Sequence, residues 1–148
     1  MVQWRANLLH GDAELLRALR EAKSVAVLGA KVDPAQPACY VPAYLHRHGY
    51  HIYPVNPTLE GAEVFGERFV PTLADLPQPV DVVEVFRRPA VLPGHAAEIL
   101  ALAWRPAVVW FQLGIRHDGA AERLARAGIR VVQDRCMMPE HLRLLGAA

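Results

Sequence analysis

The sequence predicts a doubly wound α/β domain, with helices on both faces of a mainly parallel five-stranded sheet. Five short apolar runs, rich in valine, alternate with segments of helical periodicity along the chain. Most of the runs are continuously apolar, which is typical of parallel strands that are buried on both faces. Regular alternation of such strands with helices is typical of a three-layer architecture.

The pattern begins with a helix and a first strand. Residues 12–22 are predicted to be helical, with Asp12 as the N-cap, because leucines recur there at helical spacing. Residues 25–28 form the first strand, which ends at Gly29. A buried strand that leads through a glycine turn into a helix is a common binding site for phosphate in α/β proteins.

The second helix is predicted to begin near Cys39, so that Pro42 falls in its first turn, where proline is tolerated. Gly49 is expected to end this helix, since glycine readily takes the left-handed conformation that follows a helix. Residues 50–55 form the second strand, which the Asn56-Pro57 pair ends because proline cannot donate to a ladder.

The middle of the chain contains shorter elements before the pattern resumes. Residues 64–66 are expected to be a short turn or strand, and residues 73–76 a single helical turn. Residues 80–86 form the third strand. A helix then runs through Ala103, with Pro89 and Pro93 in its first turns and Ala103 on its buried face.

The last third of the chain supplies two more strands. Residues 107–111 form the fourth strand, and Asp118 is expected to cap the helix that Gly128 ends. Residues 129–132 form the fifth strand, and a short final helix is expected near residues 140–145.

Composition narrows the class of protein. The 148 residues, 53% hydrophobic and 21% charged, predict one globular domain over residues 1–148. No apolar run approaches the roughly 20 residues that span a bilayer, and the N-terminus does not resemble a signal peptide, so we expect a cytoplasmic protein. A net charge of +1 gives no indication of nucleic-acid binding, and two cysteines make neither a disulfide framework nor a zinc site.

Ligands of open parallel sheets bind beyond the carboxyl ends of the strands. Five segments meet that condition: residues 29–33, 53–57, 86–89, 112–114 and 134–136. Gly29 allows a close backbone approach, and Lys31, Arg87 and Arg88 offer cationic partners for an anion. The alternative is that Gly29 is only a turn residue and that the arginines lie on a solvated face.

The glycine loop differs from the dinucleotide-binding fingerprint. That fingerprint is G-x-G-x-x-G, followed about 20 residues later by an acidic residue for the ribose hydroxyls. This loop contains a single glycine, and the second strand ends in Asn56-Pro57 with no carboxylate. The sequence therefore disfavours ordinary NAD binding and predicts another nucleotide or phosphate ligand.

Five motifs then occur in one order along the chain. They are Val27-Leu28-Gly29-Ala30, Gly49-Tyr50 before Tyr53-Pro54-Val55-Asn56-Pro57, the run from Val82 to Pro89, the run from Val109 to Ile115, and Ala127-Gly128-Ile129 before Asp134-Arg135-Cys136. In this order they resemble the small stand-alone CoA-binding domain proteins. Those proteins are similar to the N-terminal, Rossmann-like domain of the succinyl-CoA synthetase α subunit and of ADP-forming acyl-CoA synthetases.

The resemblance implies that coenzyme A lies across the strand ends. Its phosphates would meet the loop of residues 29–32, and the Asn56-Pro57 turn would line the cleft. Residues 85–88 would flank the nucleotide or the pantetheine arm, and residues 112–114 would form the far wall. The implied coenzyme-binding residues are Gly29, Ala30, Lys31, Val32, Asn56, Pro57, Val85, Phe86, Arg87, Arg88, Gln112, Leu113, Gly114 and Cys136. Many relatives have serine where this chain has Ala30-Lys31 or Cys39-Tyr40, and Lys31 would compensate for a lost hydroxyl contact by its charge.

Other reactive side chains have structural as well as functional interpretations. Cys39 is expected at a helix N-terminus, where the helix dipole lowers the pKa of a thiol, so that Cys39 or Cys136 would form a mixed disulfide with the CoA thiol. The alternative is that each is a small buried apolar residue. His46, His48 and His51 have neither metal-ligand nor triad spacing, which favours surface or helix-cap roles, and Trp104 and Trp110 are expected to pack in the core.

These observations predict a non-catalytic protein that binds CoA or an acyl-CoA. The synthetases that it resembles phosphorylate a histidine outside this domain and need a separate nucleotide-grasp domain, and we expect neither within these 148 residues. Three alternatives stay open: a detached subunit that completes an ADP-forming acyl-CoA ligase with a partner chain, an NAD(P)-binding regulator, and an interaction module with a vestigial cleft. Self-association or a protein partner also stays open.

Overall fold

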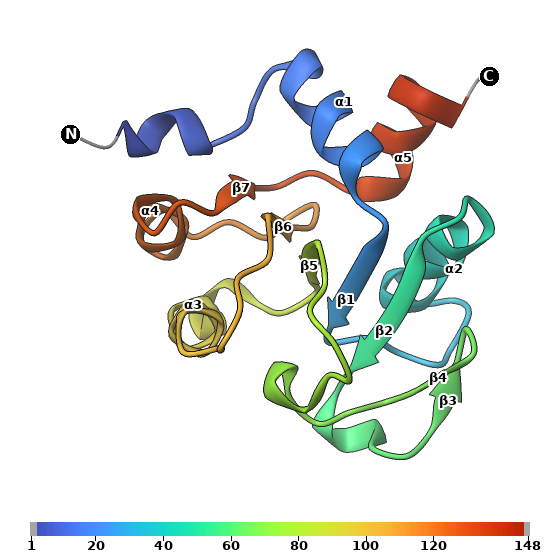
Figure 1. Ribbon diagram of the computed structural model, residues 1–148. Coiled ribbons are helices and arrows are strands. Elements are labelled where there is room, and N and C mark those ends of the chain that lie inside the picture. Colours follow the sequence, from blue (N-terminus) through green and yellow to red (C-terminus); the bar gives the residue numbers. More distant parts are fainter. Residues whose placement is uncertain (1–2, 147–148) are drawn as a thin grey trace.

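Five parallel strands form one sheet in the order β2-β1-β5-β6-β7. In the computed structural model, which describes residues 3–146, this sheet twists through the middle of the molecule (Figure 1). The strands are β1 (Ser24–Leu28), β2 (His51–Val55), β5 (Val82–Val85), β6 (Val108–Phe111) and β7 (Arg130–Val132). All five coincide with the predicted strands to within two residues, and the doubly wound class is confirmed.

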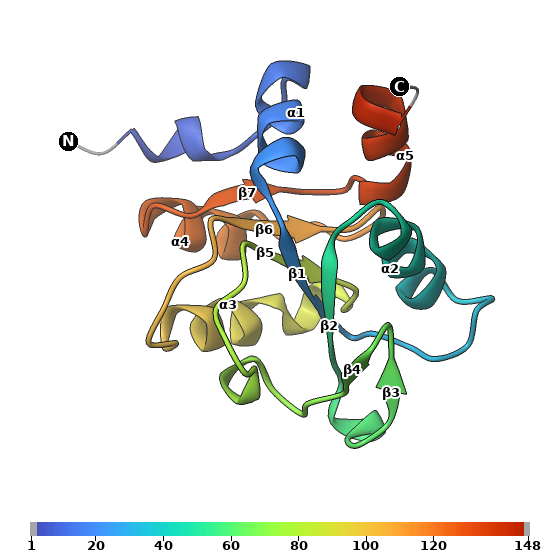
Figure 2. The same ribbon diagram turned by 45° about the vertical axis from the view of Figure 1, so that its right-hand side comes forward.

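Helices cover both faces of the sheet. They are α1 (Asp12–Glu21), α2 (Pro37–Arg47), α3 (Leu92–Leu100), α4 (Asp118–Arg126) and α5 (Met137–His141). Figure 2 shows α3 and α4 against one face and α1, α2 and α5 against the other. Because β1 pairs with both β2 and β5, the strand order reverses between β1 and β5, and their carboxyl ends open a crevice there.

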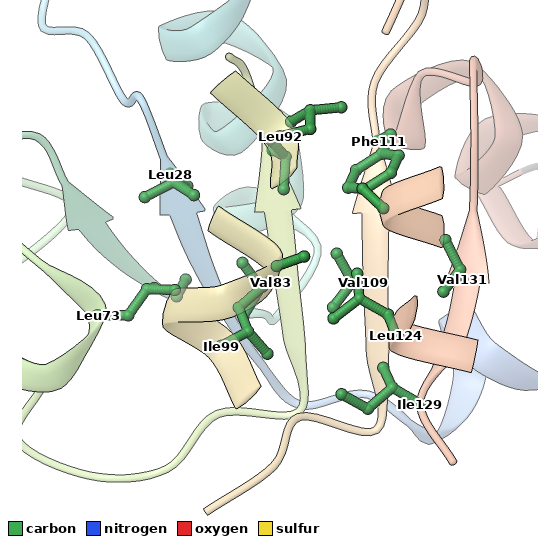
Figure 3. Packing of buried hydrophobic residues seen from close by; sticks show 14 of the residues in the cluster. Leu28, Leu73, Val83, Leu92, Ile99, Val109, Phe111, Leu124, Ile129 and Val131 are labelled. Carbon is green, nitrogen blue, oxygen red and sulfur yellow. The ribbon is translucent and has the colours of Figure 1, made fainter. Parts of the chain in front are cut away.

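The core beneath α3 and α4 takes every second residue of the strands, because successive side chains in a strand point to opposite faces. Val83 and Val109 lie in the middle of this face, with Ile99 of α3 and Leu124 of α4 packed on them (Figure 3). The other set of strand residues packs under α1 and α2. It includes Trp110, whose indole N–H donates to the carbonyl oxygen of Arg135 at 2.7 Å.

Both edges of the sheet are covered for part of their length. On the β2 edge, Pro54 has no N–H, and its carbonyl oxygen accepts from the amide of Val70 at 3.2 Å. On the β7 edge, Leu8 forms a parallel bridge with Val131, and the Leu9 amide donates to the Val131 carbonyl oxygen at 2.9 Å. A short hairpin of β3 (Glu63–Val64) and β4 (Glu67–Arg68) lies beside β2.

The structure corrects two predicted N-caps. Asp12 and Asp118 are the first residues of their helices, and the caps are Gly11 and His117. The Nδ1 atom of His117 accepts from the Ala120 amide at 3.0 Å, which is the bond that an aspartate cap would otherwise make. Both aspartates still stabilise their helices, since a negative charge in the first turn complements the helix dipole.

Helix α2 begins two residues earlier than predicted, at Pro37. Pro42 therefore lies inside the helix and not in its first turn, so that the carbonyl oxygen of Ala38 has no helical donor. That oxygen accepts instead from the amide of Lys31, at 3.2 Å. The proline is tolerated because a loop residue supplies the missing donor.

The remaining differences lie at the ends of helices. Helix α3 stops at Leu100, and Ala103 is exposed, so its predicted place on the buried face is wrong; Pro106 follows and disfavours a longer helix. The last helix begins at Met137, earlier than predicted, and continues as a π-helical turn. Within residues 3–146, no helix has the length and hydropathy that crossing a bilayer requires.

Candidate functional site

The crevice between β1 and β5 is built around Gly29. Its φ of +89° is a conformation that side chains disfavour, and a Cβ atom on it would lie 2.4 Å from the carbonyl oxygen of Phe86. The Gly29 amide donates to the carbonyl oxygen of Val55 at 2.9 Å. The space that the missing side chain of Gly29 leaves is therefore taken by the Phe86 backbone of this chain. The Gly29 amide is already hydrogen-bonded to the end of β2.

The loop after Gly29 is tied to its neighbours at two points. The side-chain amide of Asn56 donates to the carbonyl oxygen of Ala30 at 2.9 Å, and the Lys31 amide donates to Ala38. The side chain of Lys31 is exposed, and Val32 exposes 46% of its surface, which is unusual for a large apolar residue. Lys31 and Val32 are thus presented outward from a loop whose backbone is fixed.

Asn56 has a positioning role. Besides bonding Ala30, its Oδ1 atom accepts from the amide of Thr58 at 3.0 Å and from the Thr58 hydroxyl at 2.8 Å. The side chain is buried, and these bonds join the loop after β1 to the turn after β2. Pro57, which begins that turn, is exposed and reaches the crevice.

A cleft of about 240 Å³ lies over the crevice, on the side of the sheet that α3 covers. Gly29, Pro57 and Arg87 of the predicted site line it. Thr72, His95 and Glu98 also line it and were not predicted, because they come from α3 and from the turn before residues 73–75. The rule that ligands bind at strand ends does not identify these residues, because none of them directly follows a strand of the large sheet in sequence.

Arg87 supplies the positive charge of this cleft. Its Nε atom is buried and has no hydrogen-bond partner among residues 3–146. The neighbouring Arg88 is exposed, at the start of a 3-10 turn. His95 donates a hydrogen bond to Glu98 at 2.9 Å, and this bond lowers the pKa of Glu98. The Leu73 amide and the charges of His95 and Arg87 also lower this pKa. A cationic side chain with an unpartnered donor atom thus lines the cleft.

The predicted residues on β6 lie apart from this cleft. Gln112 is buried and points into the core, where its Nε2 atom donates to Oε2 of Glu84 at 2.6 Å. Burial raises the pKa of Glu84 to about 8. Leu113 is 70% exposed, and the Gly114 amide donates to Oδ1 of Asp134 at 2.6 Å. The β6 end therefore presents Leu113 to solvent and keeps its polar side chain inside.

Phe86 is half-buried among the residues of the α1 and α2 side, and Val85 is fully buried. Leu113 and Cys136 line a second, larger cavity beyond β7. The structure thus divides the predicted residues: some surround the cleft at the crevice, some reach the far cavity, and Asn56, Val85 and Gln112 are enclosed in the fold.

Residues 23–142 match the family model described as a CoA binding domain. The chain belongs to the CoA-binding domain family. It is 35% identical to YneT of Bacillus subtilis (strain 168) over 87% of this chain and 93% of that protein. It is also similar to the structure of cell-free ID.343 from Thermus thermophilus, with 52% identity, a TM-score of 0.87, and coverage of 92% of this chain and 100% of that one.

The fold recurs in a larger protein. An acetyl-coenzyme A synthetase from Ca. Korarchaeum cryptofilum matches with a TM-score of 0.61 over 78% of this chain and 27% of that one. At 24% identity this likeness concerns the fold alone. This likeness of fold agrees with the resemblance to the synthetase domains that the sequence motifs indicated.

The two thiols of the CoA-binding domain differ from the prediction. Cys39 is the third residue of α2, yet burial raises its pKa, helped by the charge of Asp33, so the predicted lowering is wrong. Burial also raises the pKa of Cys136, the half-buried N-cap of α5. Desolvation outweighs the dipole at both places, and Cys39 is the small buried residue of the alternative interpretation.

His48 and His51 make structural contacts at the surface of the fold. His48 caps the C-terminal end of α2 and donates from Nδ1 to the carbonyl oxygen of Tyr44 at 2.8 Å, and the exposed His51 pairs with Glu67 at 2.7 Å. Within the described part of the chain, no three side chains of the metal-ligating types come together.

Proposed function

We propose that this CoA-binding domain binds coenzyme A, free or acylated, across the carboxyl ends of its strands and performs no chemistry on it. The observation that carries the proposal is Arg87, which lines the cleft at the β1–β5 crevice and whose buried Nε atom has no acceptor among residues 3–146. A buried donor without an acceptor is costly, and a phosphate oxygen is a strong acceptor for a guanidinium group. Membership of the family indicates which phosphate compound to expect.

The residues around Arg87 fit the charged half of coenzyme A. Lys31 and Arg88 are exposed near the same strand ends and add two positive charges for the phosphate groups. Glu98 contributes a negative charge, but its hydrogen bond with His95 partly offsets it. The structure would hold the nucleotide at the cleft through these cations, while Asn56 and Pro42 keep the supporting loops in place.

The side chains that could transfer protons or act as nucleophiles support a binding role. Glu84 is fully buried and bonded to Gln112, and both thiols have raised pKa values. None of these groups lines the cleft beside Arg87, and the two titratable side chains that do, His95 and Glu98, are bonded to each other. Two other functions compete with this proposal. Ligase activity with a partner chain would indicate a ligase subunit, and a preference for NAD over CoA would indicate an NAD(P)-binding regulator.

The test is a thermal-shift and calorimetric comparison of CoA, acetyl-CoA, NAD and ATP. A ligand at 100 times its dissociation constant adds about 2.7 kcal/mol to the free energy of unfolding, which is a readily measured shift. We expect CoA and acetyl-CoA to stabilise the protein and NAD to have no comparable effect. A response to NAD without one to CoA would overturn the proposal, as would acyl-CoA ligase activity of the isolated chain.

A pair of variants locates the site. Arg87→Ala removes a charged hydrogen bond worth about 1.5–3 kcal/mol, so CoA affinity should fall about tenfold or more. Arg123→Ala is the matched control, because Arg123 is exposed on α4 and does not line the cleft. Equal losses of affinity in the two variants would contradict the placement of the phosphates at Arg87.

A further inference from the structure

A cavity of about 610 Å³ lies at the far end of the carboxyl edge, beyond β7. Its apolar lining comes from Trp4, Leu8, Val131 and Ala121, which belong to the N-terminal segment, β7 and α4. Figure 1 shows the N-terminal turn and α4 beside β7. Val131 and Ala121 are buried core residues, so this floor is part of the rigid fold.

About half of the residues that line the cavity are polar or charged, and acidic side chains outnumber arginines among them: Asp118, Glu122, Asp134 and Glu140 against Arg116 and Arg135. Arg116 bonds Asp118 at 3.1 Å, and Arg135 bonds Glu140 at 3.4 Å. Glu122 pairs with Arg126 at 2.8 Å. The excess of acidic side chains disfavours a carboxylate, and the apolar part of the lining suits an uncharged aliphatic chain.

Leu113 connects this cavity to the predicted coenzyme path. It follows β6 directly, lines the cavity and is 70% exposed. The bond from the Gly114 amide to Asp134 holds its loop in place. A leucine fixed in such an exposed position provides an apolar contact at the entrance, beside Cys136.

The spacing of the strands matches the length of the coenzyme. From β1 to β7 there are three strand intervals, which amount to about 14 Å. A pantetheine arm has the length of about four extended residues, which is also about 14 Å. Phosphates held beside Gly29 and Arg87 would therefore allow the sulfur of the coenzyme to reach past Leu113 to the cavity beyond β7.

We propose that the cavity beyond β7 receives the acyl group of a short- or medium-chain, uncharged acyl-CoA. This inference rests on the proposed function and names the form of the coenzyme that the chain prefers. Burial of each methylene group contributes about 0.8 kcal/mol, so affinity should rise about fourfold for each methylene added until the cavity is filled.

The test is calorimetry with CoA, acetyl-CoA, butanoyl-CoA, hexanoyl-CoA and succinyl-CoA. Glu122→Trp places a large side chain at the cavity from the surface of α4, and Arg123→Trp is the control on the next, outward-facing residue. We expect Glu122→Trp to remove the gain with chain length while leaving the affinity for CoA unchanged. Arg123→Trp should behave as the unmodified chain does.

The outcomes separate the two proposals. Equal affinities for CoA and hexanoyl-CoA, or a chain-length gain that survives in Glu122→Trp, would overturn the acyl cavity and leave CoA binding intact. Tighter binding of succinyl-CoA than of butanoyl-CoA would overturn the preference for an uncharged group. Absence of binding to every thioester and to CoA would overturn the proposed function together with this inference.

Discussion

The amide of Lys31 donates to the carbonyl oxygen of Ala38 across 3.2 Å. Pro42, four residues further along α2, is the reason that this oxygen is free. A proline inside a helix thus determines the conformation of the loop that follows β1. Since that loop presents Lys31 and Val32 outward, the shape of the proposed phosphate site depends on a residue that does not touch it.

Restoring the helical donor should loosen this loop. In Pro42→Ala, the new amide competes with Lys31 for the Ala38 oxygen, so the Lys31 amide should exchange with deuterium faster. The amides of β1 should exchange as before, because the strand ladder is unchanged. Unaltered protection of Lys31 would show that the loop is held without this bond.

Gly29 should be the least replaceable of the turn glycines. Gly29→Ala brings a Cβ atom to within 2.4 Å of the Phe86 carbonyl oxygen and strains a φ of +89°, so the free energy of unfolding should fall by about 3 kcal/mol or more. Gly49→Ala is the control, because its φ of +96° is similar but nothing lies within 4 Å. It should cost about 1 kcal/mol in urea unfolding. Similar losses would contradict the importance of the Phe86 contact.

Asn56 should stabilise the junction of two loops. Asn56→Ala leaves the Ala30 carbonyl and the Thr58 amide without their partners, and should lower the free energy of unfolding by about 2 kcal/mol. Thr58→Ala removes one hydroxyl bond to Asn56 and keeps the backbone bond, so its loss should be below about 1 kcal/mol. Urea unfolding of the two variants compares them, and a larger loss in Thr58→Ala would refute this assignment.

Glu84 should make stability depend on pH. Its pKa is raised from 4.5 to about 8 by burial, so the folded chain keeps a proton that the unfolded chain releases above about pH 4.5. The free energy of unfolding should therefore fall as pH rises from 4.5 to 8, by at most about 1.4 kcal/mol per pH unit, and level off above pH 8.

Glu84→Gln keeps an oxygen for the Gln112 donor and removes the titration. The difference in unfolding free energy between this variant and the unmodified chain should grow in favour of the variant from pH 5 to pH 8. Comparing the two proteins cancels the titrations that they share, including that of His141, whose pKa is lowered by burial. A difference that does not change with pH would contradict the raised pKa of Glu84.

The strands and their layer arrangement could be predicted because most strands are continuous apolar runs that alternate with segments of helical periodicity. Helix starts were harder. Asp12 and Asp118 satisfy the rule for caps, but Gly11 and His117 occupy the capping positions. Pro42 was misplaced because its tolerance inside α2 depends on Lys31, a contact that no local pattern reveals.

The candidate site was predictable only in part. Gly29, Pro57 and Arg87 follow from the rule that ligands bind at strand ends, and the structure brings them to one cleft. Asn56 and Gln112 satisfy the same rule, but their side chains turn inward to partners that are 26 and 28 residues away in sequence. His95 and Glu98 reach the cleft from α3, and their contribution depends on how that helix is packed.

The covered edges of the sheet have a consequence for the protein at high concentration. An open edge strand is a template for pairing with another chain, and so for aggregation. Pro54 and the Val70 segment cover the carboxyl end of the β2 edge, while Leu8 and Leu9 cover β7 at Val131. Leu8 and Leu9 therefore hinder the pairing of β7 with a strand of another molecule, and we expect their removal to expose this edge of the sheet.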